Sequence, residues 1–200
     1  MENEIYRVTF AEGRLTALGA LALLGALLLT ATWHDVRSRR IPNAIVFSGA
    51  VLGLLLHSVL PAGGGLVSAV PGGLGLLKSL AGLGIGLAAL LPLYFLRAAG
   101  AGDAKLMAMV GAFLGPMDAL GAVLCTFAAG AVLAVGVAIK AKVFGRMVRN
   151  VRLILYGAAA KLAAVDGPAF DARTDAAAKL PYALAIALGT GVWLALRHFS

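Results

Sequence analysis

Six apolar stretches, each without Asp, Glu, Lys or Arg, constrain the fold of this 200-residue chain more than any other feature. A helix needs about 20 residues to cross roughly 30 Å of hydrocarbon, so stretches of this kind predict membrane-spanning helices. The stretches lie at residues 15–33, 44–60, 79–96, 106–115, 119–139 and 180–196. The second and the last need a few flanking residues to span the membrane. We read the first as a retained helix and not as a signal peptide, because the leader before it is not basic.

The fourth stretch, 106–115, is too short to cross a membrane unaided. It can do so only if the Gly-rich segment before it lies at membrane depth inside the protein, where irregular backbone finds hydrogen-bond partners. The segment 97–105 is therefore an unusual part of the chain. Small-residue spacing at Gly82 and Gly86 predicts close helix packing in the third stretch.

Composition supports the same reading. Apolar residues make up 61% of the chain and charged residues 13%, with a formal net charge of +8. Such hydrophobicity excludes a disordered chain and argues against a soluble DNA-binding domain, so we expect no nucleic-acid partner. The single cysteine, Cys125, excludes an internal disulfide and a Cys-based zinc site. The prediction is one all-α domain over residues 1–200, a polytopic membrane bundle of about six helices.

The basic residues indicate an orientation. With six spans, the loops 34–43, 97–105 and 140–179 share one side, which carries 13 lysines and arginines against 4 on the other. The positive-inside rule places that side in the cytoplasm and both termini outside. Within the longest loop, 140–161 has an apolar stripe at helical spacing with basic residues opposite. It predicts an interfacial amphipathic helix on an anionic inner leaflet; the alternative is a helix that lines the entrance to a site.

Acidic residues are scarce, and most have ordinary roles. Asp118 follows Gly-Pro and is placed to cap the fifth helix. Six others are expected to be solvated charges: Glu2, Glu4, Glu12, Asp166, Asp171 and Asp175. Asp35 and Asp103 are left, both at the predicted cytoplasmic face. Taken singly, Asp35 could pair with nearby arginines, and Asp103 could pair with Lys105 or cap the fourth helix.

Taken together, the two carboxylates suggest an aspartyl dyad. Two Asp side chains close together cannot both ionise easily, so they share a proton. The ionised one can take a proton from water, and the protonated one can donate a hydrogen bond to a scissile carbonyl. Either residue can be the base. The glycines before Asp103 would let an extended peptide approach the backbone.

Residues 100–105, Gly-Ala-Gly-Asp-Ala-Lys, resemble the GxGDxK motif of type IV prepilin peptidases, which are intramembrane aspartic proteases. Asp35 with Arg-Arg-Ile-Pro-Asn at 39–43 resembles the other motif of that family. The tail from Lys179 through Tyr182 to Gly189 is similar to the family's last helix.

The resemblance implies a peptidase that cuts the short basic leader from prepilins or pseudopilins at the cytoplasmic face of a bacterial inner membrane. Asp35 and Asp103 match the catalytic positions. The remaining motif or substrate-binding positions are Gly100, Gly102, Lys105, Arg40, Pro42 and Asn43. Lys105 is expected to reach lipid head groups or an acidic group of the substrate.

Longer family members carry paired CxxC motifs and also methylate the new terminus. This chain has one cysteine and a ten-residue first cytoplasmic loop, so it is similar to the short, peptidase-only form of Tad/Flp pilus systems. We expect no cofactor and no metal, and the oligomeric state is left open. The alternatives are a small proton-coupled transporter that uses the two Asp as a relay and a structural membrane subunit.

Overall fold

The protein is all-α, as predicted. The computed structural model describes residues 2–95, 99–140 and 181–198, with isolated positions between 141 and 153, and side chains from residue 13 onward. The helices are α1 (Glu2–Ser38), α2 (Asn43–Val59), α3 (Leu76–Phe95), α4 (Ala101–Leu114), α5 (Pro116–Lys140) and α8 (Tyr182–His198). No strand occurs within these ranges, apart from one isolated bridge between Ala62 and Gly73.

Among the residues that the structure describes, three helices are long and apolar enough to cross a membrane: Gly13–Ser38 within α1, Leu76–Phe95 and Pro116–Lys140. Helix α2 is apolar but has only 17 residues. The outer surface is apolar as well, with Leu29 70%, Trp33 65% and Leu77 83% exposed. Large apolar side chains on the outside suit a chain whose solvent is lipid. The structure is thus a membrane helix bundle, although helix length alone supports three spans.

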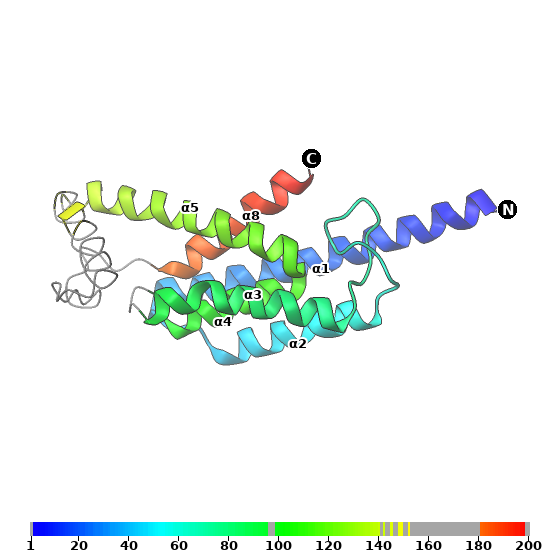
Figure 1. Ribbon diagram of the computed structural model, residues 1–200, viewed down its shortest axis with the longest axis horizontal. Coiled ribbons are helices and arrows are strands. Elements are labelled where there is room, and N and C mark those ends of the chain that lie inside the picture. The colour runs from blue at the N-terminus through cyan, green and yellow to red at the C-terminus, as the bar shows by residue number, and fades with distance from the viewer. Residues whose placement is uncertain are drawn as a thin grey trace, which may run out of the picture.

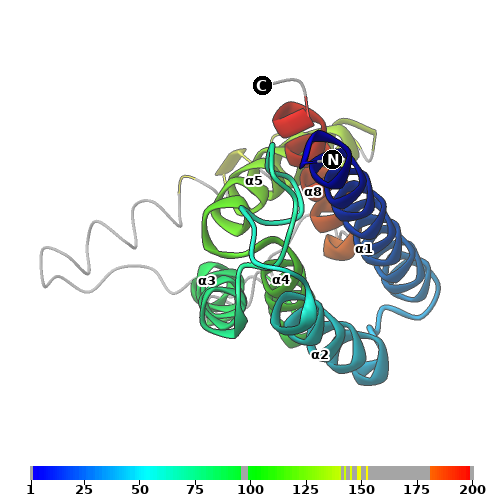
Figure 2. The same cartoon turned by 90° about the vertical axis from the view of Figure 1, so that its right-hand side faces the viewer.

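Helix α4 occupies the centre of the bundle. It contacts each of the other five described helices, and every residue from Leu106 to Leu114 is buried. Figures 1 and 2 show the helices running along the long axis, with α4 between α2 and α3 and below α5. A helix this apolar and only 14 residues long does not need to reach both membrane surfaces, because its neighbours enclose it.

Glycines set the closest helix contacts. A Cβ at Gly82 would collide with the carbonyl oxygen of Gly111 on α4, and one at Gly86 with that of Met107. The predicted packing role of Gly82 and Gly86 is therefore confirmed. Between α5 and α8, Gly121 lies under the indole of Trp193 in the same way. Small residues let backbones approach where lipid offers no hydrophobic driving force between helices.

Two details differ from the sequence expectation. Asp118 does not cap α5, because the helix already begins at Pro116. Its Oδ1 instead accepts hydrogen bonds from Trp193 Nε1 at 3.2 Å and from Arg197 Nε at 3.0 Å, and so joins α5 to α8. The segment expected to be a loop through residue 105 becomes helical at Ala101.

The connection between α2 and α3 folds over a buried histidine. His57, 1% exposed, accepts the Leu74 N–H at Nδ1 (3.1 Å) and lies 2.7 Å from the carbonyl oxygen of Phe113 through Nε2. Because a backbone N–H can only donate, Nδ1 is the acceptor and Nε2 carries the proton. His57 thus ties α2, the connection and the end of α4 together. The predicted amphipathic helix at 140–161 lies outside the described residues, apart from isolated positions.

Candidate active site

Asp35 lies in the last turn of α1 and is held by another helix. Its side chain is buried, with 8% exposed, and its Oδ2 accepts the Ala183 N–H at 3.2 Å. Ala183 stands in the first turn of α8, directly after Pro181 and Tyr182. The first N–H groups of a helix lack intrahelical partners, and proline offers no side-chain acceptor. Asp35 therefore supplies from α1 the cap that α8 lacks, at the helix end that favours a negative charge.

Asp103 is held by its own helix. It is the third residue of α4, equally buried at 8% exposed, and its Oδ2 accepts the Gly100 N–H at 2.8 Å. Gly100 is the N-cap residue, with φ −82° and ψ 158°. The bond is the half of a capping box in which the side chain reaches back to the N-cap backbone. Of the alternatives for Asp103, the helix cap is therefore realised.

The structure brings these two carboxylates together from helices 68 residues apart in the chain. Asp35 lies at the C-terminal end of α1 and bonds to the first turn of α8, and Asp103 lies at the N-terminal end of α4. Helices α1, α4 and α8 contact one another in pairs around this point. Within the described residues, each carboxylate has one oxygen held by a backbone N–H and a second oxygen without a donor.

The remaining motif residues join α4 to α2. Lys105 Nζ donates to Asn43 Oδ1 at 3.1 Å and lies 5.4 Å from the ring centre of Phe47. At Gly102, a Cβ would lie 3.3 Å from the Cβ of Ile41, so the start of α4 is packed closely against the turn after α1. Lys105 is half-buried, and its ammonium contacts two residues of α2; that it also reaches lipid head groups or a substrate acidic group stays a prediction.

The turn between α1 and α2 completes the region. Pro42 is the N-cap residue of α2, with φ −62° and ψ 128°, which suits a proline ring. Arg39 has a φ of 53°, in the left-handed region, where the chain reverses. Arg40 is exposed in this turn, and its carbonyl accepts the Ser38 hydroxyl at 3.4 Å. Pro42 and Asn43 thus position α2, whereas the Arg40 side chain faces outward.

Family comparison agrees with the motifs. Residues 22–135 match the model of the type IV leader peptidase family. The chain belongs to this family. The matched range runs from α1 into α5, so it contains both Asp35 and Asp103. Membership indicates peptidase activity and, in general, processing of prepilin-type substrates. No curated protein and no solved structure matches the chain.

One contact of Asp35 in this family member, the hydrogen bond from the Ala183 N–H, involves a residue outside the matched range. Sequence reasoning noted the tail around Tyr182 but assigned it no site residue. Ala183 contributes only a backbone N–H, and no sequence pattern identifies a backbone donor that acts across helices. The one available signal is Pro181, which directly precedes α8 and offers no side-chain cap to it.

Proposed function

We propose that this protein is a membrane aspartic endopeptidase that removes the short N-terminal leader of prepilin or pseudopilin-like proteins. One observation carries the proposal. Asp35 and Asp103, from different helices, are both buried, and they lie at the ends of α1 and α4, two helices that contact each other and α8. Family membership supports the peptidase class. The basic loops at this end favour cleavage at the cytoplasmic face, with both termini outside.

The hydrogen bonds to Oδ2 of Asp35 and of Asp103 suit the two carboxylates to general acid–base catalysis. Because a backbone N–H fixes Oδ2 of each residue, the Oδ1 atoms are left to meet water and substrate. The ionised carboxylate takes a proton from a water molecule, whose oxygen attacks the carbonyl carbon of the scissile bond. The protonated carboxyl donates a hydrogen bond to the carbonyl oxygen. When the C–N bond breaks, the departing nitrogen receives a proton from the dyad. Either Asp can act as the base.

The surroundings favour an extended peptide. Gly100 carries no side chain directly before α4, so a substrate backbone can approach Asp103 there, whereas Gly102 is packed against Ile41. Lys105 and Asn43 hold α2 against α4 near Asp103. With a single cysteine, the chain has no counterpart of the CxxC insertion, which supports a peptidase without methyltransferase activity.

The proposal is tested by prepilin cleavage with protein purified in detergent, comparing wild type with Asp35→Asn and Asp103→Asn. Each substitution should lower cleavage by about 10²-fold or more, since proton transfer by a positioned group contributes on that order. Asp118→Asn is the matched control, because Asp118 is equally buried but bonds to Trp193 and Arg197 away from the pair. Full activity in either Asp35→Asn or Asp103→Asn would disprove the dyad. Proton transport without any cleavage would favour the transporter instead.

A further inference from the structure

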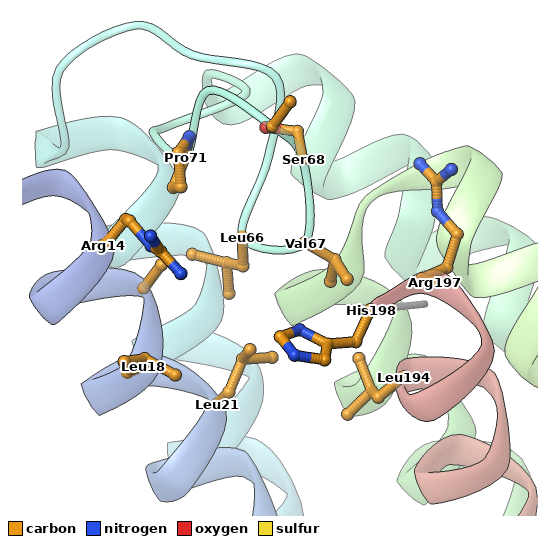
Figure 3. Close-up of a pocket in the computed structure, with 12 residues that line it drawn as sticks. Arg14, Leu18, Leu21, Leu66, Val67, Ser68, Pro71, Leu194, Arg197 and His198 are labelled. Carbon is orange, nitrogen blue, oxygen red and sulfur yellow. The ribbon is translucent and has the colours of Figure 1, made fainter. Parts of the chain in front are cut away.

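A cleft of about 580 Å³ lies at the end of the bundle opposite Asp35. It is bounded by the outer part of α1, the connection between α2 and α3, and the end of α8 (Figure 3). Arg14 on its rim is 21 residues before Asp35 on the same helix, which places the two about 30 Å apart along α1. The cleft is therefore separate from the candidate active site.

Helices α1 and α8 both line this cleft with a basic residue at its outer edge and leucine deeper in the bundle. On α1, Arg14 lies at the outer edge, and Leu18 and Leu21 follow one and two turns deeper on the same face. On α8, which runs in the opposite sense, Leu194 lies one turn deeper than His198. Figure 3 shows the side chains of Arg14 and His198 reaching toward the space between the helices. The lining is thus cationic at the rim and apolar toward the middle of the bundle.

The rim lies where a membrane boundary is expected. The charge-free stretch of α1 begins at Leu15, directly after Arg14, and the charge-free stretch of α8 ends at Leu196, directly before Arg197. Arg197 also lines the cleft, and Asp118 neutralises it through the 3.0 Å bond to Nε. Arg14 is the second exposed arginine of the rim, and the lining contains no Asp or Glu among the described residues.

We propose that this cleft binds one anionic phospholipid of the leaflet opposite the candidate active site. The phosphodiester meets Arg14 and the rim, and the first carbons of an acyl chain lie against Leu18 and Leu21. A soluble anion would bind Arg14 at the rim, but the leucines would add nothing to its binding free energy. A zwitterionic lipid would place its own positive charge beside Arg14, which would weaken its binding. The order of charge and apolar surface therefore favours an anionic lipid over both.

Native mass spectrometry of the purified protein can test this with three probes: dioctanoyl phosphatidylglycerol, dioctanoyl phosphatidylcholine and inorganic phosphate. We expect phosphatidylglycerol to bind about fivefold more tightly than phosphatidylcholine, since one basic residue near a lipid surface contributes about that factor. Arg14→Gln should remove this preference. Leu18→Ser should weaken both lipids; Leu18 is 62% exposed, so the variant is expected to fold.

Lys78→Gln is the matched control. Lys78 is an exposed cation near the start of α3, at the same end of the bundle but outside the cleft. It should leave the lipid preference unchanged. Equal affinity for the two lipids, an Arg14→Gln variant that keeps the preference, or phosphate binding as tight as that of phosphatidylglycerol would each overturn the proposal. The measurement needs no cleavage, so it is independent of the proposed peptidase function.

Discussion

The bond between the Ala183 N–H and Asp35 allows a sharp test of how the candidate site is held. Replacing Ala183 by lactic acid through nonsense suppression turns the amide N–H into an ester oxygen. The side chain keeps the same shape, which matters because Ala183 is fully buried. The substitution removes the donor that lies 3.2 Å from Asp35 Oδ2 and adds no atom that could push the carboxylate aside.

The expected loss follows from the kind of hydrogen bond. A bond to a charged group contributes about 1.5–3 kcal/mol. Because 1.4 kcal/mol corresponds to a factor of ten in rate, an Asp35 that is no longer held should lower kcat/KM for prepilin cleavage by about 10- to 100-fold. The assay is single-substrate cleavage by the purified ester variant, with kcat and KM determined separately.

The matched control is leucic acid at position 184. The Leu184 N–H lies in the same turn of α8 but donates to the Pro181 carbonyl at 3.2 Å and not to Asp35. Each ester removes one N–H bond and weakens one carbonyl, so the difference between them compares the bond to Asp35 with a backbone bond of the same length in the same turn. A position-183 ester with kcat/KM within about twofold of the native enzyme, or an equal loss in both esters, would refute the reasoning.

Two stability predictions concern the packing that positions the site. Gly82→Ala should destabilise the protein by about 1–3 kcal/mol, the usual cost of overpacking. Gly84→Ala is the control and should not destabilise it, because a Cβ at Gly84 meets nothing within 4 Å. Thermal unfolding in detergent measures both variants, and equal effects would contradict the close approach of α3 and α4. His57→Leu should cost about 2–5 kcal/mol, since it leaves the Leu74 N–H and the Phe113 carbonyl without their partner. An unchanged unfolding temperature in His57→Leu would mean that this histidine does not hold the connection over α4.

Much of the architecture could be predicted because it depends on local patterns. Apolar stretches free of charge indicate helices in lipid, and five of the six described helices begin and end within five residues of the expected ranges. Helix α1 is longer, because it already begins at Glu2 and not at residue 15. Scarcity indicates the candidate pair: of nine acidic residues, seven are assigned ordinary roles, and Asp35 and Asp103 remain as two carboxylates at the same predicted face. The small-residue spacing of Gly82 and Gly86 likewise indicated a packing face before any partner was known.

Other features depended on partners distant in the chain. The helix-cap expectation for Asp118 was wrong because Trp193 and Arg197, some 75 residues away, take its carboxylate. Nothing near His57 in the sequence indicates that Leu74 and Phe113 enclose its ring.

The sequence by itself determined that this is a helical membrane protein with two candidate aspartates and a family motif around each, since hydrophobic periodicity and motif spacing are properties of the chain. Only the tertiary structure decided that the short α4 lies at the centre of the bundle and that a backbone N–H of α8 holds Asp35. The physical reason is that the backbone groups at helix ends have no partner in their own helix. They bond to whichever suitable group lies nearby, and that group is determined only when the helices pack.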